Sequence, residues 1–299
     1  MGLTVETLAL TCVILLAAGY VLFIVLGFVP SLAPIVRDSW PILFTETLIV
    51  GTAAGSIYIG GWVLTLALLA HAIRTGYEAA HVTNRRAPTL PPIAVGLGIA
   101  GLAYLASFFP IALTAGLALI VIGGAMRAMR LVNHTRNSTE RVALDLLVFP
   151  TVPLIVFTAA GLHGGYEVWL LVAFILVETF DSYALLGGKF FGRHKAFPVL
   201  SPRKTVEGLV IGAVILMLTA GLVGAWLADL PWSTSCAIAL FTGILTVTGD
   251  LTASRLKRLS SVKDFPKVLP HQGGLLDITD AWIASGAGLI VIASIYGFG

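Results

Sequence analysis

Long apolar segments recur from one end of the chain to the other, separated by short polar stretches. Nine such segments lie at residues 3–29, 42–73, 92–108, 109–126, 143–160, 167–185, 206–228, 233–250 and 279–297. A transmembrane helix needs about 20 predominantly apolar residues, and helices satisfy their own backbone hydrogen bonds within lipid. The pattern therefore predicts an all-α, polytopic integral membrane bundle of about nine transmembrane helices. Pro110 divides the apolar stretch 92–126 into two short spans or one re-entrant hairpin. A single span there would reverse half of the orientation assignment.

The composition supports this class. Of the 299 residues, 58% are hydrophobic and 11% are charged, whereas soluble domains have about 25% charged residues. The mean hydropathy of +0.97 excludes a soluble globular protein and leaves no room for a separate soluble domain. Cys12 and Cys236 each lie inside an apolar segment, which excludes a disulfide framework and a cysteine-based zinc site. Glu6, with no Lys or Arg before the first apolar segment, favours a retained span over a cleaved secretory signal.

The basic residues predict the orientation. Of the 18 Lys and Arg residues, 17 fall in alternate connections. They are Arg74, Arg85, Arg86, Arg127, Arg130, Arg136, Arg141, Lys189, Arg193, Lys195, Arg203, Lys204, Arg255, Lys257, Arg258, Lys263 and Lys267. Only Arg37 falls on the other side. Because cytoplasmic loops carry the excess of Lys and Arg, the N-terminus is predicted to be cytoplasmic and the C-terminus outside, in the cell inner (cytoplasmic) membrane.

The acidic residues divide the chain into two parts. Residues 1–141 are predicted to form a scaffold of transmembrane helices, in which Glu46 and Glu78 are the acids near span ends. Residues 142–299 are predicted to form a catalytic region with cytoplasmic loops 186–205 and 251–278. Its acids near span ends are Glu178, Asp181, Glu207, Asp250, Asp277 and Asp280. An ionisable group in hydrocarbon costs at least about 2.5–3.5 kcal/mol, so each is a candidate site residue.

The first candidate cluster surrounds the loop 186–205. Glu178 and Asp181 are three residues apart, so they lie on one helical face and could share a metal ion. The loop combines glycines with five cations, which suits a polyphosphate, although a basic loop that only sets the orientation is the alternative. The candidate substrate-binding residues here are Asp181, Ser201, Arg203, Lys204, Thr205 and Glu207.

The second candidate cluster consists of carboxylates from two spans. Asp250 ends one span and Asp277 opens the next, so the two are expected to meet at one membrane depth. Asp280 shares a helical face with Asp277. Carboxylate oxygens completed by water and phosphate oxygens are the ligands that Mg²⁺ prefers, which predicts a metal site at these three residues. A structural salt bridge with Lys257 or Arg258 is the alternative.

A glycine pair precedes this span. Gly273 and Gly274 form a turn at the start of the predicted helix, where backbone N–H groups favour an anion. His271 is a further candidate, although a lone loop histidine is more often a solvated or capping residue.

These residues resemble the phosphatidate cytidylyltransferases, also called CDP-diacylglycerol synthases, over about residues 178–282. The positions that match the family signature are Ser254, Lys257, Arg258, Lys263, Asp264, Gly273, Gly274, Asp277 and Asp280. This chain departs from the signature in two places. It has His271-Gln272 where the family has Gly-His, and Ile278 where the family has Arg.

The resemblance implies a membrane nucleotidyltransferase that converts CTP and phosphatidate to CDP-diacylglycerol and pyrophosphate. It implies Mg²⁺ held by Asp250 and Asp277, with a second cation such as K⁺ as an option. Lys204 and Lys257 would act on the triphosphate. The remaining substrate-binding residues would be Asp181, Ser201, Arg203, Thr205, Glu207, Ser254, Arg258, Lys263, His271, Gly273 and Gly274. Membrane lipid and a second copy of the chain in a homodimer are the expected partners, and no nucleic acid is expected.

Three other functions remain open at this point. A related CTP-dependent membrane enzyme would act on a polyprenol or another lipid phosphate. A transporter would place its acids near span centres, beside discontinuous helices. A catalytically silent partner protein would have lost the carboxylates, and this chain retains them.

Overall fold

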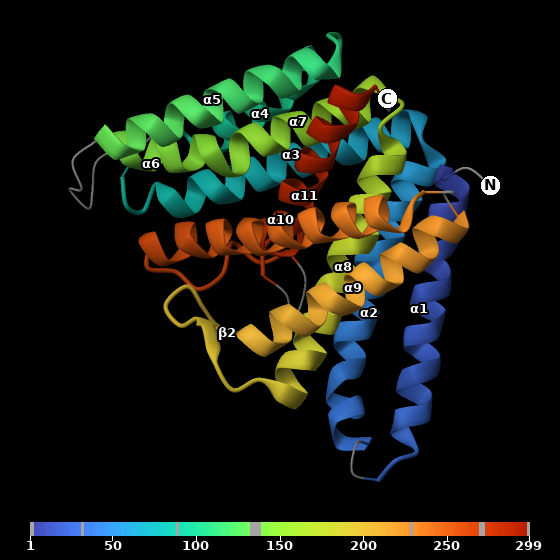
Figure 1. Ribbon diagram of the computed structural model, residues 1–299. Helices are drawn as coiled ribbons and strands as arrows, with labels where there is room; N and C mark the ends of the chain where they lie inside the picture. Colours follow the sequence, from blue (N-terminus) through green and yellow to red (C-terminus); the bar gives the residue numbers. More distant parts are fainter. Residues whose placement is uncertain are drawn as a thin grey trace.

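The computed structural model describes residues 3–30, 33–87, 90–131, 139–227, 230–268 and 273–297, and these are almost entirely helical (Figure 1). The helices are α1 (Val5–Gly27), α2 (Ala33–Ile59), α3 (Gly61–Thr83), α4 (Pro92–Ala106), α5 (Ile111–Leu131), α6 (Thr139–Leu146), the π-helical turn η1 (Leu147–Thr151), α7 (Val152–His163), α8 (Glu167–Phe191), α9 (Val206–Leu227), α10 (Trp232–Leu259) and α11 (Leu275–Tyr296). Two short strands, β1 (Lys195–Phe197) and β2 (Ser201–Thr205), form an antiparallel hairpin between α8 and α9.

Seven helices in the described part of the chain are long and apolar enough to cross a membrane. Two shorter apolar helices, Leu43–Ile59 and Pro92–Ala106, accompany them. These lengths confirm the predicted class, a polytopic helical membrane protein. The orientation of the N-terminus stays a prediction.

The predicted single span 42–73 is wrong. α2 ends at Ile59 and α3 begins at Gly61, with a break between them. Gly60 and Gly61 have φ angles of +67° and +50°, a left-handed conformation that glycine adopts without a Cβ clash. Hydropathy alone hides this break, because a Gly-Gly pair is not polar enough to interrupt an apolar run.

The stretch 92–126 forms two helices, as predicted. α4 ends at Ala106 and α5 begins at Ile111, directly after Pro110. Proline has no backbone N–H and is well tolerated at the start of a helix, so it separates the two helices here.

α11 is the central helix of the bundle, since it contacts α3, α5, α7, α8 and α10. Trp282 anchors it: the indole Nε1 donates a hydrogen bond to the Leu170 carbonyl of α8 at 2.9 Å. The Trp282 ring also meets Phe157 of α7 edge-on, with centroids 4.9 Å apart. This packing holds the N-terminal end of α11, which carries the predicted metal carboxylates, against the ends of α3 and α10.

Candidate functional site

Lys204 joins three helices at the end of β2. Its Nζ lies 3.0 Å from Oδ2 of Asp250 on α10 and 3.5 Å from Oδ1 of Asp181 on α8. The carboxylate of Asp280 on α11 also acts on its charge. Burial by itself lowers the pKa of Lys204, but the carboxylates of Asp181 and Asp250 outweigh burial and raise it above the ordinary value. Lys204 therefore remains an ammonium ion at neutral pH.

This Lys204 cluster is open on one side. The side chains of Asp181 and Asp250 are 44% and 23% exposed. A carboxylate offers about four lone-pair positions, so both groups retain acceptor sites for a cation or water. Ser254 adds a hydroxyl, whose Oγ donates to Oδ1 of Asp250 over 3.4 Å. The cluster can therefore bind a ligand without rearranging the bundle.

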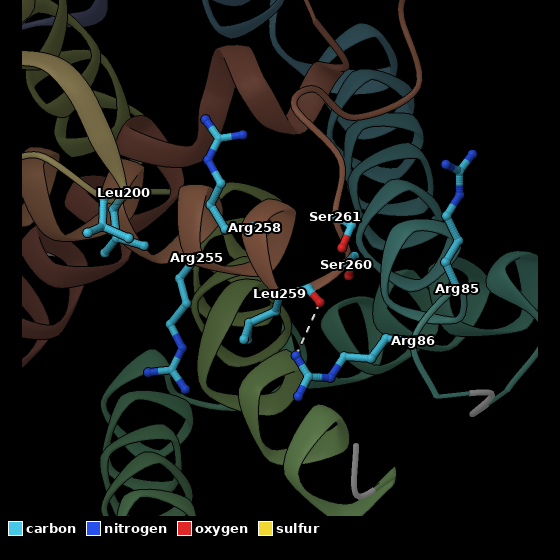
Figure 2. Close-up of a pocket in the computed structure, with 9 residues that line it drawn as sticks. Arg85, Arg86, Leu200, Arg255, Arg258, Leu259, Ser260 and Ser261 are labelled. Carbon is cyan, nitrogen blue, oxygen red and sulfur yellow. Dashed lines mark hydrogen bonds between the residues drawn. The ribbon is translucent and has the colours of Figure 1, made fainter. Parts of the chain in front are cut away.

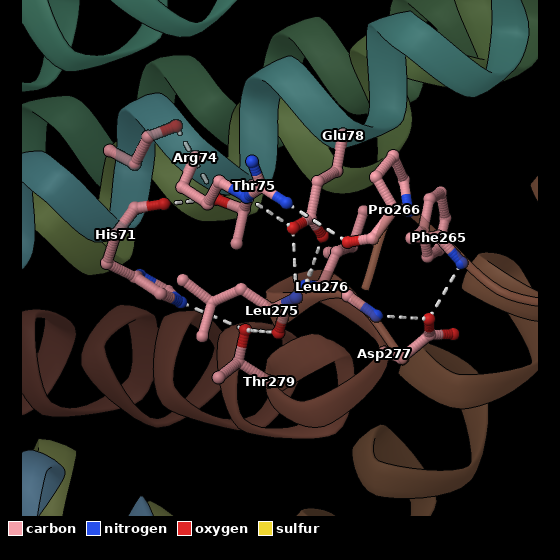
Figure 3. Close-up of polar contacts among 12 residues, drawn as sticks. His71, Arg74, Thr75, Glu78, Phe265, Pro266, Leu275, Leu276, Asp277 and Thr279 are labelled. Carbon is pink, nitrogen blue, oxygen red and sulfur yellow. Dashed lines mark hydrogen bonds and ion pairs between the residues drawn. The ribbon is translucent and has the colours of Figure 1, made fainter. Parts of the chain in front are cut away.

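Lys257 and Asp277 form a second, closed pair. Lys257 Nζ is 2.5 Å from Oδ1 of Asp277, and the two side chains are only 11% and 12% exposed. Oδ2 of Asp277 accepts hydrogen bonds from the backbone N–H groups of Phe265, at 2.8 Å, and Gly274, at 2.9 Å (Figure 3). Lys257 also lies 5.4 Å from the centre of the Phe265 ring. Protein donors thus take three of the roughly four acceptor positions of Asp277.

Among the described residues, Asp250 and Asp277 have different lysine partners, and their expected meeting at one membrane depth stays a prediction. A Cβ on Gly249, next to Asp250, would touch the Asp280 carbonyl and Ala284, whereas Lys257 meets Asp277. α10 and α11 therefore run antiparallel. Asp280 lies close enough to Asp250 for their charges to interact, and Asp277 lies three residues before Asp280 on α11, about 4.5 Å along the helix axis.

The turn before α11 holds a carboxylate that the sequence assigned to the scaffold. Glu78 of α3 is buried and accepts hydrogen bonds from the backbone N–H groups of Leu275, at 3.0 Å, and Leu276, at 2.8 Å (Figure 3). Arg74 Nε donates to Glu78 at 2.7 Å, and Arg74 Nη2 donates to the Pro266 carbonyl at 3.0 Å. The N-terminus of α11, expected to receive an anion of the substrate, is filled by the protein's own glutamate.

The same arrangement explains the glycine pair. A Cβ on Gly274 would collide with the Glu78 carboxylate, and one on Gly273 would collide with the Asp277 carboxylate. The absence of a Cβ at both positions thus leaves space for carboxylates of the protein itself. The only sequence signal for Glu78 was its position near the end of a predicted span. That position did not reveal which helix Glu78 caps.

Several predicted substrate residues hold the β1–β2 hairpin in place. Glu207 accepts from the backbone N–H of Arg193 at 3.0 Å and from Nδ1 of His194 at 2.5 Å. Thr205 is buried, and its Oγ1 accepts from the Gly208 N–H at 3.2 Å at the start of α9. These contacts anchor the segment that presents Lys204.

The other predicted residues lie around the two clusters. Ser201 pairs with Phe197 in the hairpin, and Arg203 is exposed beside Lys204. Arg258 donates to the Val262 carbonyl at 3.3 Å, and Lys263 is exposed. His271 and Gln272 lie outside the described residues, so the role of His271 stays a prediction.

The donor set fits a metal that arrives with a phosphate ligand. Within the described ranges, no group of three or more His, Cys, Asp or Glu side chains could hold a metal ion. Mg²⁺ usually takes one or two carboxylates and completes its shell with water and substrate phosphates. Asp250 and the neighbouring Asp280 supply that number of oxygen ligands.

The fold and this cluster define a polytopic helical membrane protein with a lysine held among carboxylates from three helices. The chain belongs to the cytidylyltransferase family, whose model matches residues 42–296.

Three relatives show the range of similarity. The Escherichia coli (strain K12) protein named Uncharacterized protein YnbB is 38% identical over 132 residues, 44% of this chain and 43% of that protein. A phosphatidate cytidylyltransferase of Synechocystis sp. is 39% identical over 115 residues, 38% of this chain and 39% of that protein. One of Rickettsia felis is 30% identical over 176 residues, 54% of this chain and 74% of that protein. The match therefore spans less than half the length of the first two relatives.

Proposed function

We propose that this protein is a multi-pass enzyme of the cell inner membrane that joins CTP and phosphatidate, giving CDP-diacylglycerol and pyrophosphate for phospholipid biosynthesis. The family match and the two relatives named phosphatidate cytidylyltransferase support this activity. The structural observation that carries it is Lys204, held 3.0 Å from Asp250 and 3.5 Å from Asp181 at one open site.

The reaction requires positioning and charge stabilisation more than a strong base. The second pKa of a phosphate monoester is near 6, so phosphatidate is largely a dianion at neutral pH. One of its oxygens forms a bond to the α-phosphorus of CTP, and the bond from that phosphorus to the bridging oxygen of the β-phosphate breaks. The electron pair leaves with pyrophosphate, and no proton has to be removed from the nucleophile.

Asp250, Asp277 and Asp280 would hold Mg²⁺, and Asp277 would do so through the acceptor position of Oδ1 that Lys257 leaves open. When bound, the ion would offset negative charge on the nucleotide phosphates. A second cation such as K⁺ belongs to the same proposal.

Lys204 would direct its ammonium group toward a triphosphate oxygen, from its position between Asp181 and Asp250. Ammonium and guanidinium groups that face developing phosphate charge lower the barrier without reorganising water. Arg203 and Arg258 would supply further positive charge, and Ser201 and Ser254 would supply hydroxyl donors. Lys257, which the Asp277 carboxylate holds in place, would contribute its charge from a fixed position.

An apolar groove lies among the membrane helices, on a different face of α10 from Asp250. It has a volume of about 310 Å³ and lies between α5, η1, α7, α10 and α11. Gly249 and Thr252, which flank Asp250 on α10, line it together with Ala284 of α11. A polyprenol or other lipid phosphate acceptor is not favoured, since the relatives with a named activity are phosphatidate cytidylyltransferases.

The test is pyrophosphate release by the purified protein with CTP, Mg²⁺ and phosphatidate. We expect release that depends on phosphatidate, exceeds release with a polyprenyl phosphate, and disappears with EDTA or in Asp250→Asn. Folded protein that binds CTP but releases no pyrophosphate with phosphatidate would contradict the proposal. Mass measurement in detergent, with the detergent contribution subtracted, tests the proposed homodimer.

A further inference from the structure

A separate pocket rich in arginine opens beside the ends of α3 and α10 (Figure 2). Its volume is about 590 Å³. Arg85 and Arg86 come from the segment after α3, Arg255 and Arg258 come from α10, and the tip of the β1–β2 hairpin closes a further side with Leu200. None of the described residues that line it is acidic. Of the four arginines, only Arg258 belongs to the predicted substrate site.

Two residues that line this pocket each have a buried donor atom with no partner within the described structure. These atoms are Nε of Arg86 and Oγ of Ser260, and Ser260 is only 8% exposed. Arg86 is nevertheless held in place, because its Nη1 donates to the Leu259 carbonyl at 3.1 Å. Burying a polar group without a hydrogen bond is unfavourable, so unpaired donors in residues that line one pocket indicate a ligand with acceptor oxygens.

The charges around the pocket leave an excess of positive charge. Nη2 of Arg255 lies 3.2 Å from Oδ1 of Asp145 on α6, which neutralises one guanidinium. Among the described residues, the hydrogen bonds of Arg86 and Arg258 go to main-chain carbonyls, which carry no net charge. Arginine presents a planar fork of N–H donors that matches phosphate oxygens.

We propose that this pocket binds a phosphate group carrying at least two negative charges, with Arg86 Nε and Ser260 Oγ donating hydrogen bonds to it. Two sources share this chemistry: the phosphate chain of pyrophosphate or CTP, and the phosphomonoester headgroup of a lipid such as phosphatidate. The pocket lies beside the end of α10, a helix long and apolar enough to cross a membrane, so either source could reach it. The site rests on the unpaired donors and the excess charge, and it stands independently of cytidylyl transfer.

The experiment measures ligand binding without turnover. The full-length protein in detergent is titrated with pyrophosphate and with CTP in the absence of Mg²⁺, and the protein in nanodiscs is titrated with phosphatidate in phosphatidylcholine. The variants are Arg86→Gln, Arg86→Lys and Ser260→Ala. Arg127→Gln, which removes the same charge from an exposed position on α5, is the matched control.

We expect Arg86→Gln to weaken binding by about tenfold or more, the range for losing a hydrogen bond to a charged group. Arg86→Lys should weaken it nearly as much, since lysine keeps the charge but has no Nε–H. Ser260→Ala should give a smaller loss, and Arg127→Gln should bind like the unmodified protein. Ser260→Ala also keeps the test valid if Arg86→Gln does not fold.

If the variants lose affinity for pyrophosphate and CTP alone, the site is supported and its ligand is a soluble polyphosphate. If they lose affinity for phosphatidate alone, the site is supported and its ligand is a lipid headgroup. Unchanged affinity for all three ligands in Ser260→Ala and in the folded Arg86 variants would overturn the proposal, as would equal losses in Arg127→Gln. Phosphate binding that depends on Arg86, in a protein that forms no CDP-diacylglycerol, would leave this site standing while the proposed reaction fails.

Discussion

The two lysine–carboxylate clusters contain the same chemical groups but differ in how completely they are paired. Lys204 is shared between Asp250 at 3.0 Å and Asp181 at 3.5 Å, and the Asp181 side chain is 44% exposed. Lys257 meets Asp277 alone at 2.5 Å, and both side chains are almost completely buried. One cluster retains free acceptor sites that face an opening, while the other has its partners supplied by the protein.

This difference separates residues suited to a ligand from residues that hold the ligand-binding elements in place. Removing one partner of a buried ion pair is strongly destabilising, because the other charge is left buried without compensation. An open cluster contributes less to stability and can exchange a lysine for a metal ion or a phosphate. The carboxylates of the signature therefore divide into two roles that their sequence spacing does not distinguish.

The largest expected effect is on catalysis at the open cluster. Asp250→Asn should reduce turnover by about a thousandfold, because a metal ligand worth several kcal/mol of charge stabilisation is lost. Pyrophosphate release measures this effect, and thermal unfolding in detergent should stay close to that of the unmodified protein. Turnover within about tenfold of the original would show that Asp250 is not essential to the reaction.

The next effect is on stability at the closed cluster. Lys257→Met leaves the Asp277 carboxylate buried without its cation, which should cost about 3–5 kcal/mol in the free energy of unfolding. The double variant Lys257→Met with Asp277→Asn should recover a substantial part of this loss. Chemical unfolding in detergent measures both. If Lys257→Met unfolds like the original protein, the two clusters do not differ as proposed.

A smaller effect is expected at the turn that supports the closed cluster. Gly274→Ala places a Cβ against the Glu78 carboxylate, which should destabilise the protein by about 1–3 kcal/mol. Gly98→Ala is the matched control, since nothing lies within 4 Å of a Cβ there. Its helical position on α4 should tolerate alanine or gain stability. Equal melting temperatures for the two variants would contradict the close packing of Glu78.

The smallest effect concerns pH at the open cluster. The carboxylates hold the pKa of Lys204 above its ordinary value of 10.5. Its ion-pair stabilisation is therefore complete below that value and is lost only as the pH rises through the raised pKa. Between pH 7 and 9 the pH–rate profiles of the unmodified protein and Lys204→Arg should have the same shape. A change of slope confined to the lysine enzyme would show that Lys204 titrates in this range.

The sequence predicted the elements of the fold with one error in the first half. Apolar length identified the membrane spans, and Pro110 correctly separated α4 from α5. The prediction of a single span over 42–73 was wrong because the break at Gly60 and Gly61 depends on backbone conformation. A hydropathy pattern does not record backbone conformation.

The candidate site was predicted as a set of residues but not as a set of partners. Asp181, Lys204 and Asp250 were singled out from their positions at span ends, and the structure brings them together. The pairing of Asp277 with Lys257, weighed only as an alternative, depends on how α10 and α11 are aligned. The capping of α11 by Glu78 joins residues almost 200 positions apart, so local spacing carried no signal for it.

The sequence by itself determined that this chain is a helical membrane bundle and which charged residues it retains near its span ends. It could do so because burying a charge in hydrocarbon is unfavourable and apolar length is a local property. Only the tertiary structure decided which carboxylates stay open to a ligand and which the protein's own lysine and backbone N–H groups occupy. That choice depends on helix register and on contacts between distant segments, because a hydrogen bond acts over about 3 Å whereas spacing along a helix defines only a face.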